Sequence, residues 1–239
     1  MLCEKPLASN LKEVEAMCEA AFKNGVVLME AMKTTVLPTF QLLKDHLHKI
    51  GTIRRYSASF CQYSSRYDAY RSGTILNAFK NELSNGALLD IGVYTIAPMI
   101  HLFGLPGEIK ASAYMLESGV DGEGSIIFKY PTMEACVMYS KISNSYLPSE
   151  IQGEDGTVMI DRINRFHQVQ IKYRNGEIEE LAIPHDEADM KYELEEFIQT
   201  ILKQKKESNV NTLERSKQVM SVLDEVRRQI GLQYPADLK

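Results

Sequence analysis

The chain has 239 residues, of which 44% are hydrophobic and 25% are charged, and its formal net charge is -5. This composition is typical of a globular protein that can bury a sizeable core, and it excludes a disordered chain. The acidic balance argues against nucleic acid as a partner, because a phosphate backbone requires a basic face. No apolar run approaches the roughly 18 residues of a membrane span and no signal-peptide pattern opens the chain, so no membrane association is predicted.

The cysteines and histidines indicate neither a disulfide framework nor a metal site. No two cysteines form a C-x-x-C pair, and His46 and His48 are two residues apart on a predicted helix, so they point in different directions. We therefore predict no metal and a reducing cytoplasm. The four cysteines are Cys3, Cys18, Cys61 and Cys136.

The first 30 residues predict one helix and one strand. Asn10 is placed to cap a helix over residues 11–23, with Glu13 three positions later as in a capping box. The apolar run 26–29 has the pattern of a parallel strand that is buried on both faces. Because about three or more strands are needed for a stable sheet, this segment is predicted to be the tail of a larger domain.

A helix, a strand and a long loop are predicted next. Pro38 begins the helix and Gly51 ends it. Alternating apolar and polar side chains predict a strand over residues 52–63. The polar and aromatic segment 64–80 is long for a loop in a compact domain. Two interpretations stay open for it, a loop beside the substrate and a solvated surface loop.

The stretch Gly86-Ala-Leu-Leu-Asp90-Ile-Gly92-Val-Tyr94 opens a predicted helix that runs to residue 103. Asp90 and Tyr94 are four residues apart, so both project from one face. On this mostly apolar helix the Asp90 carboxylate must be paired, and a structural acid and a functional one both remain open. Lys5, which Pro6 restricts to extended geometry, is expected to meet them. An amine, an acid and a phenol together suit proton transfer at a hydroxyl.

The second half of the chain predicts an antiparallel sheet followed by two helices. Asn175-Gly176 is a strong hairpin signal between two of the strands. Each closing helix carries an apolar stripe, within residues 190–202 and 219–230, and both stripes are expected to face the core. The predicted fold class is α+β, a large, mostly antiparallel sheet with helices on one face. The predicted strands cover residues 108–116, 123–130, 134–142, 156–160, 169–173 and 178–183.

Two motifs together resemble one enzyme family. Glu4-Lys5-Pro6 followed by a helix and a strand, and the stretch 86–94 about eighty residues later, are similar to the Gfo/Idh/MocA family of nicotinamide-dependent oxidoreductases. The resemblance runs over essentially the whole chain. The tyrosine in the second motif resembles the dihydrodiol dehydrogenase and glucose-fructose oxidoreductase branch more than the histidine-bearing inositol dehydrogenases.

The resemblance also implies a missing part. Family members begin with a Rossmann domain that carries a glycine-rich turn, and no G-x-G-x-x-G follows a predicted strand here. Residues 1–30 are therefore expected to be the last helix and strand of a truncated Rossmann domain, with Met1 where relatives have a valine. Residues 31–239 would form the C-terminal substrate-binding and dimerisation domain. Alone, the chain is expected to bind no dinucleotide tightly and to be inactive.

The resemblance implies roles for the clustered residues. The family transfers a hydride between NAD or NADP and a carbon that bears a secondary hydroxyl, on a sugar, polyol or diol. Tyr94 would be the general acid/base, Lys5 the cation that lets it work near neutral pH, and Asp90 the residue that orients Lys5 or binds the substrate. Glu4, Lys5 and Pro6 would lie against the cofactor, with a cis Lys5-Pro6 bond.

The open face of the sheet is expected to meet a second subunit, as in the family, which predicts a homodimer or a higher homo-oligomer. Two further hypotheses remain. The chain could be a non-catalytic dimerisation or small-ligand-binding module, or Lys5, Asp90 and Tyr94 could form a structural polar cluster.

Overall fold

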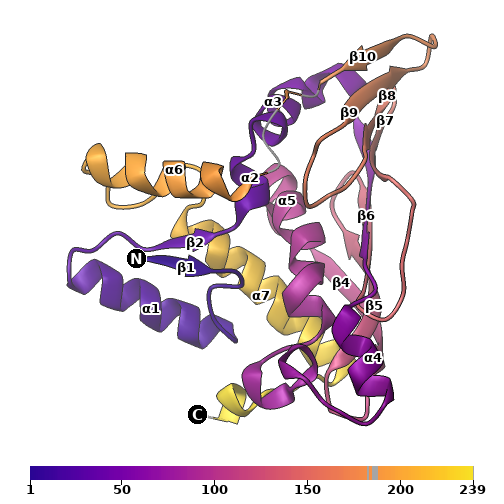
Figure 1. The fold of residues 1–239 in the computed structure, drawn as a ribbon. Helices are drawn as coiled ribbons and strands as arrows, with labels where there is room; N and C mark the ends of the chain where they lie inside the picture. Colours follow the sequence, from indigo (N-terminus) through magenta and orange to yellow (C-terminus); the bar gives the residue numbers. More distant parts are fainter. Residues whose placement is uncertain (182, 185–187, 239) are drawn as a thin grey trace.

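The computed structural model describes residues 1–181, 183–184 and 188–238. These residues form a two-stranded sheet near the amino end and a separate eight-stranded sheet (Figure 1). The strands are β1 Leu2–Glu4, β2 Met29–Ala31, β3 Ile53–Cys61, β4 Glu108–Met115, β5 Asp121–Lys129, β6 Glu134–Ser140, β7 Ser149–Gly153, β8 Gly156–Ile160, β9 Val169–Tyr173 and β10 Ile178–Glu180.

The large sheet has the strand order β10-β9-β8-β7-β3-β6-β5-β4. Strands β3 and β6 are parallel, and the other neighbours are antiparallel, so the predicted α+β fold with a mostly antiparallel sheet is confirmed. At the centre, Tyr56 lies between Ala135 and Ile151 of the adjacent strands, and all three side chains are buried. The sequence pattern missed β7, because Ile151 is the only strongly apolar residue in it.

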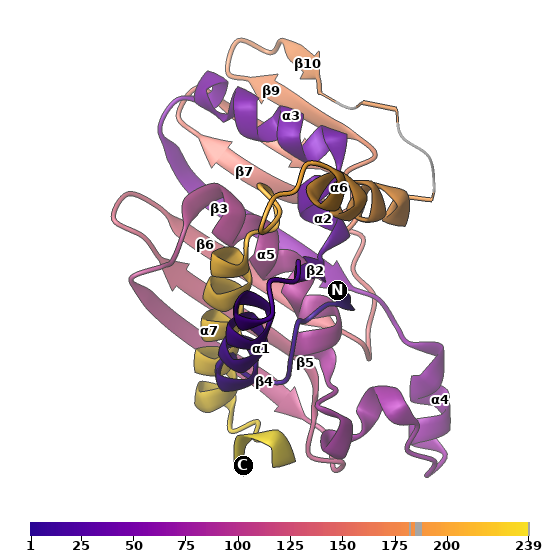
Figure 2. The same cartoon turned by 90° about the vertical axis from the view of Figure 1, so that its left-hand side faces the viewer.

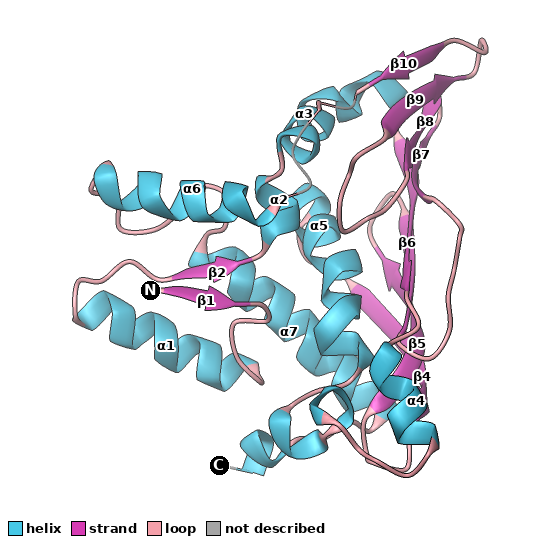
Figure 3. Ribbon diagram, in the orientation of Figure 1, coloured by secondary structure: helices cyan, strands magenta, loops and turns pink. Residues whose placement is uncertain are grey.

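Helices cover one face of this sheet (Figure 3). On that face Ile126, Phe128 and Val137 are buried, whereas Ile127 and Met138, which alternate with them, point away and are exposed. Alternation of this kind is expected where one side of a sheet meets the core. The helices are α1 Leu11–Lys23, α2 Lys33–Val36, α3 Pro38–His46, α4 Ser65–Arg71, α5 Val93–Phe103, α6 Met190–Leu202 and α7 Leu213–Ile230, with short turns of 3-10 helix at Leu47–Ile50, Asn77–Phe79, Asn81–Leu83 and Pro235–Leu238.

The central helix begins with a turn of π-helix, Leu88–Gly92, that continues into α5. Gly104, at a φ of 74°, ends it. Within the described residues, Asn81–Phe103 is the one helical stretch that is long and apolar enough to cross a membrane, judged by length and composition alone. Since 67% of its most apolar window is buried inside the fold, it is accounted for as the core helix against which the sheet packs.

The small sheet lies with α1 on the side of the helical layer away from the large sheet. Strands β1 and β2 pair in parallel, with Cys3 opposite Glu30. The Asn10 side chain accepts a hydrogen bond from the Glu13 N–H at 2.9 Å, which confirms the predicted cap of α1. Helices α1 and α7 lie alongside each other in front of the sheet (Figure 2). The first 31 residues are thereby attached to the large sheet through α7.

The two closing helices compare differently with the prediction. The stripe of α7 is buried, as expected, at Val219, Val222, Leu223 and Val226. The stripe of α6 faces outward, so the prediction that it faces the core is wrong. Its polar residues Glu193 and Thr200 are buried instead. The exposed apolar residues of α6 are Met190, Leu194, Ile198, Ile201 and Leu202.

Other differences concern element boundaries. The strand predicted at 26–29 lies at Met29–Ala31, three residues later. The segment 64–80 is not a plain loop, because Ser64 caps the helix Ser65–Arg71. The strand predicted at 178–183 ends at Glu180, and residue 182 of that prediction lies outside the described residues.

Candidate functional site

Three predicted site residues meet where β1 approaches the start of α5. Lys5 Nζ lies 3.2 Å from Asp90 Oδ1 and also donates a hydrogen bond to the Asp90 main-chain oxygen. The same Nζ lies 4.8 Å from the centroid of the Tyr94 ring. The structure therefore brings Lys5, Asp90 and Tyr94 together, although 85 residues separate the lysine from the acid.

The turn that carries Lys5 is fixed by a buried glutamate. The Lys5-Pro6 peptide bond is cis, as predicted. Directly after it, the Leu7 N–H donates to Glu30 Oε1 at 3.1 Å, and Ser216 Oγ of α7 donates to Glu30 Oε2 at 2.5 Å. Burial raises the pKa of Glu30, which these two hydrogen bonds and the charge of Lys5 oppose. The lysine turn is thus tied to β2 and α7.

A second lysine, which the sequence interpretation missed, completes the charge cluster. Lys141, one residue beyond β6, donates a hydrogen bond to Asp90 Oδ2, and its side chain is only 4% exposed. Asp90 therefore receives one ammonium group on each carboxylate oxygen. Nothing in the local pattern around Lys141 marks it, because Lys141 meets Asp90 only where the π-helical turn packs against β6 in the folded chain.

The two lysines hold Asp90 in its charged form. Partial burial pushes the pKa of Asp90 up, but the charges and hydrogen bonds of Lys5 and Lys141 outweigh this and lower the pKa overall. An acid that accepts hydrogen bonds on both oxygens and has a lowered pKa is a poor proton acceptor. This geometry favours Asp90 as the residue that orients Lys5.

Tyr94 differs from its predicted state. Its ring contacts Phe60 edge to face, with centroids 5.7 Å apart, and Lys5 lies over the ring. The expectation that Lys5 lowers its pKa is not met, because burial and nearby acids raise the pKa of Tyr94, and Asp90 already pairs with the ammonium group. Tyr94 therefore holds its proton at neutral pH. The acids that raise its pKa are Asp90, Glu193, Glu4 and Asp189.

A buried acid also anchors the helix that bears Asp90 and Tyr94. Asp121 of β5 accepts a hydrogen bond from the Leu88 N–H at 2.7 Å, at the start of the π-helical turn. Gly86, at a φ of 144°, leaves the room that Asp121 needs, since a Cβ there would lie 2.2 Å from Asp121 Oδ1. Burial raises the pKa of Asp121 to about 6, against the opposing hydrogen bonds from Leu88 and Ala87.

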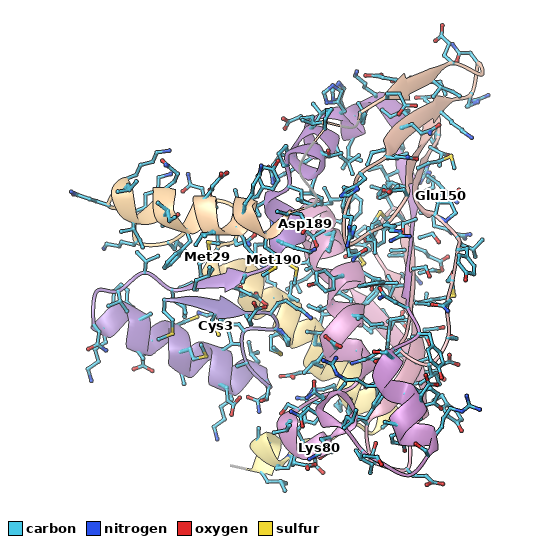
Figure 4. All side chains as sticks on the ribbon, in the orientation of Figure 1. Cys3, Met29, Lys80, Glu150, Asp189 and Met190 are labelled. Carbon is cyan, nitrogen blue, oxygen red and sulfur yellow. The ribbon has the colours of Figure 1, made fainter. Side chains whose placement is uncertain are left out.

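Helix α6 brings further acidic groups toward the site. Asp189, at the start of α6 (Figure 4), forms an ion pair with Lys33 of α2 at 2.7 Å. Glu193, one turn later, is buried, and its Oε2 has no hydrogen-bond partner among the described residues. Burial raises the pKa of Glu193 to about 7, with Glu4 and Asp189 adding to the rise and Lys33 opposing it. These groups were not singled out from the sequence.

The segment 64–80 touches the site through aromatic rings. Tyr67 and Tyr70 of α4 stack with centroids 5.6 Å apart, and both contact Phe79. The Lys141 ammonium lies over the Phe79 ring, 5.3 Å from its centroid. The segment is therefore attached to the cluster through Phe79, while residues 71–77 are exposed to solvent.

The cluster can hold and move a proton, but nothing in it marks a metal centre. In the described part of the chain, no group of three or more His, Cys, Asp or Glu side chains is arranged to hold a metal ion. Of the three residues expected against the cofactor, Lys5 lies in the cluster, Pro6 follows in the cis turn and Glu4 is exposed at the end of β1.

Comparison with known proteins gives relatives along nearly the whole chain. A scyllo-inositol 2-dehydrogenase (NADP(+)) from Bacillus subtilis is 60% identical over 237 residues, which are 99% of this chain and 72% of that protein. A trans-1,2-dihydrobenzene-1,2-diol dehydrogenase from Xenopus tropicalis is 32% identical, over 98% of this chain and 72% of that protein. The relatives therefore include dehydrogenases named for an inositol and for a dihydrodiol.

Solved structures share the fold. An aldose-aldose oxidoreductase from Caulobacter crescentus matches with a TM-score of 0.80 at 19% identity, covering 95% of this chain and 69% of that one. A 3-ketoreductase from Actinomadura kijaniata matches with a TM-score of 0.81 at 24% identity, covering 96% and 70%. The model of the GFO/IDH/MocA C-terminal domain matches residues 40–159. Together with the 60% identical relative, this match shows that the chain belongs to the GFO/IDH/MocA family of oxidoreductases.

Proposed function

We propose that this chain supplies the substrate-binding and proton-transfer part of an NADP-dependent dehydrogenase that acts on a secondary hydroxyl of a cyclic polyol. The observation that carries the proposal is the meeting of Lys5, Asp90 and Tyr94 at one point. The 60% identity to a scyllo-inositol 2-dehydrogenase (NADP(+)) makes scyllo-inositol and NADP the first candidates. Other sugars and diols are the alternatives within this class.

The charge states of the three residues indicate a different role for each in proton transfer. Tyr94 holds its proton, so it suits donation to the oxygen of a bound ketone, and it takes the proton back when the alcohol is oxidised. Lys5 lies next to it and can stabilise negative charge on that oxygen. Asp90, which accepts hydrogen bonds on both oxygens, holds Lys5 in place.

The nicotinamide group would supply or accept the hydride, and the described residues fit only one end of such a cofactor. Glu4, Lys5 and Pro6 are proposed to lie beside the nicotinamide half. The sequence has no glycine-rich turn after a strand, so this chain offers no cradle for the pyrophosphate. We therefore propose that tight cofactor binding and turnover need a nucleotide-binding part in addition to these residues.

The corner formed by β1, β2 and α6 supports this requirement. Each of the two strands has three residues and pairs only with the other among the described residues. A sheet of this size is unstable alone. Beside it, α6 exposes Met190, Leu194 and Ile198 in a row. We propose that residues 1–30 are the last helix and strand of a nucleotide-binding domain, that residues 31–239 form the substrate domain, and that the remainder of the first domain covers this corner.

Cofactor titration tests this requirement directly. NADPH is added to the 239-residue chain, and its nicotinamide fluorescence is compared with that in a titration of a longer chain that includes a nucleotide-binding part. We expect saturable binding only by the longer chain. Tight binding by the 239-residue chain would overturn the proposed division of labour.

Activity measurements test the assigned roles. In a form that turns over scyllo-inositol with NADP, Tyr94→Phe is expected to lower turnover by about 10²- to 10⁴-fold, because it removes the transferred proton. Lys5→Met is expected to lower it by a similar factor. Tyr146→Phe, at a 93% exposed tyrosine between β6 and β7, is the matched control. Full turnover by Tyr94→Phe would reject the role of Tyr94.

We also propose that the open face of the sheet joins two copies of the chain in the cytoplasm. Tyr114, Ile127 and Met138 are exposed on neighbouring strands β4, β5 and β6 of that face. Light scattering should give at least a dimer, and Ile127→Asp should shift it toward monomer. A monomer at micromolar concentration for the unchanged chain would contradict this.

The second candidate function is a non-catalytic module that assembles through the same face or binds a small ligand. The exposed apolar side chains of that face favour it. Absence of turnover with any polyol, sugar or diol when a nucleotide-binding part is present would support this alternative. The third hypothesis, a purely structural cluster, predicts that Tyr94→Phe changes stability and leaves turnover unchanged.

A further inference from the structure

We propose that Lys141 is a positioning residue of this site, whose buried ammonium group fixes the Asp90 carboxylate and, through it, Lys5 and Tyr94. This role rests on the proposed function, because it concerns the same site. Lys141 lies outside the motifs around Lys5 and Tyr94. Three features of the residue support the role: its backbone, the surroundings of its ammonium group and its charge.

The backbone of Lys141 is fixed on both sides. Its N–H donates to the Gly122 carbonyl oxygen of β5 at 2.9 Å, and its own carbonyl oxygen accepts from the Ser64 N–H at 2.9 Å. The first bond extends the β5–β6 pairing by one residue, and the second connects to the segment before α4. The Cα of Lys141, from which the side chain extends, is therefore held by backbone hydrogen bonds on two sides, as in a strand inside the sheet.

Among the described residues, the ammonium group forms an ion pair with one acid, in a confined space. It donates to Asp90 Oδ2, and on its other side lies the fully buried ring of Phe79, with the centroid 5.3 Å away. Burying an ammonium group is costly unless it is paired, so its position is tied to that of Asp90. Removal of Asp90 would leave the buried Lys141 ammonium group without its acidic partner, whereas removal of Lys141 would leave the Asp90 carboxylate held by Lys5 alone.

Lys141 also sets the net charge of the site. Lys5 and Asp90 alone would cancel, so the added ammonium group leaves this ion cluster with one excess positive charge, which opposes the effect of Glu4, Asp189 and Glu193 at Tyr94. This excess favours a negative oxygen on the substrate during hydride transfer. The groups that face Asp90 are Lys5 from β1, Lys141 from beyond β6 and Tyr94 from α5, and Asp121 of β5 also feels the charge of Lys141.

The first test needs no activity. The Asp90 carboxyl pKa is measured by ¹³C NMR in the 239-residue chain, with Asp90→Asn to assign the signal. Lys141→Met is expected to raise this pKa by about one unit, whereas Lys141→Arg should leave it near the original value. Lys49→Met, which removes the ion pair with Glu179 at the far end of the sheet, is the control. An unchanged Asp90 pKa in Lys141→Met would overturn the inference.

The second test uses turnover in the form that includes a nucleotide-binding part. Lys141→Met should lower kcat roughly tenfold and move the pH profile to higher pH, and Lys141→Arg should restore most of the loss. In an Asp90→Asn background the same change should have less than about a twofold effect, because Lys141 acts through Asp90. Equal effects in both backgrounds would reject that route. If Lys141→Met does not fold, Lys141→Gln carries both tests.

The two proposals can fail separately. If no polyol turns over but the Asp90 pKa moves as expected, the proposed function fails and the positioning role stands. If turnover occurs and the Asp90 pKa does not move, the function stands and Lys141 has no positioning role.

Discussion

Helices α6 and α7 have similar sequence patterns and opposite surroundings. Both carry apolar residues at helical spacing, and from the pattern alone both are expected to face the core. In α7 the apolar side is buried, with Leu223 fully inaccessible. In α6 the apolar side is outside, with Leu194 49% exposed, and the acid Glu193 is buried in its place.

The difference shows that an apolar stripe indicates a helix face that is to be buried. It does not indicate which part of the protein buries that face. The eight-stranded sheet buries the apolar faces of α7 and α5 within the described residues. At the corner of β1, β2 and α6, none of the described residues buries the apolar side of α6. The proposed docking of a nucleotide-binding part onto this corner follows from the contrast.

The largest expected effect on the free energy of unfolding is at the buried apolar side of α7. Leu223→Ala removes a fully buried side chain from the core between α7 and the sheet, and it should lower the free energy of unfolding by about 2–5 kcal/mol. Urea unfolding followed by circular dichroism measures it. A loss below about 1 kcal/mol would mean that α7 is held less tightly than its burial indicates.

The next effect concerns the buried acid Asp121 of β5. Its pKa is raised by burial to about 6, so the folded state binds a proton more tightly than the unfolded one, and its stabilising contribution is lost as pH rises from about 4 to about 6. Asp121→Asn should remove this loss, changing the difference in unfolding free energy between about pH 4 and pH 8 by roughly 2–3 kcal/mol. Urea unfolding at both pH values measures it.

Asp45→Asn, at an exposed aspartate of α3, is the control for Asp121→Asn. An identical pH dependence in Asp121→Asn and the unchanged chain would show that the bond from Leu88 N–H keeps Asp121 charged at little cost.

A smaller pH dependence of the unfolding free energy is expected at the corner of β1, β2 and α6. The pKa of Glu193 is raised by burial to about 7, so its stabilising contribution is lost as pH rises toward and through 7. Glu193→Gln should remove that loss, which amounts to about 1 kcal/mol after screening by solvent at this open corner. Thermal unfolding at about pH 5 and pH 8 tests it. An effect as large as that of Asp121→Asn would mean that the corner is closed to water.

The same contrast explains how much the sequence could predict. The α+β class, the strands from β3 to β9 other than β7, and the meeting of Lys5 with Asp90 and Tyr94 followed from periodicity, turn residues and two motifs. Lys141 could not be found in this way, because its contact with Asp90 depends on the packing of the π-helical turn against β6 in the folded chain. The raised pKa of Tyr94 was missed for a similar reason, since two of the acids that cause it lie on or next to α6 and reach the site only in the folded chain.

The smallest expected effect tests the contrast most directly, because it uses the same substitution on the other helix. Leu194→Ala should change the unfolding free energy of this chain by less than about 0.5 kcal/mol, since half of the side chain is already in water. Once a nucleotide-binding part is attached, the same change should cost more, because the stripe of α6 is then covered. Urea unfolding of both forms measures the difference. If Leu194→Ala were as destabilising as Leu223→Ala in the 239-residue chain, and independent of protein concentration, the stripe would already be covered and the proposed docking would have no surface to use.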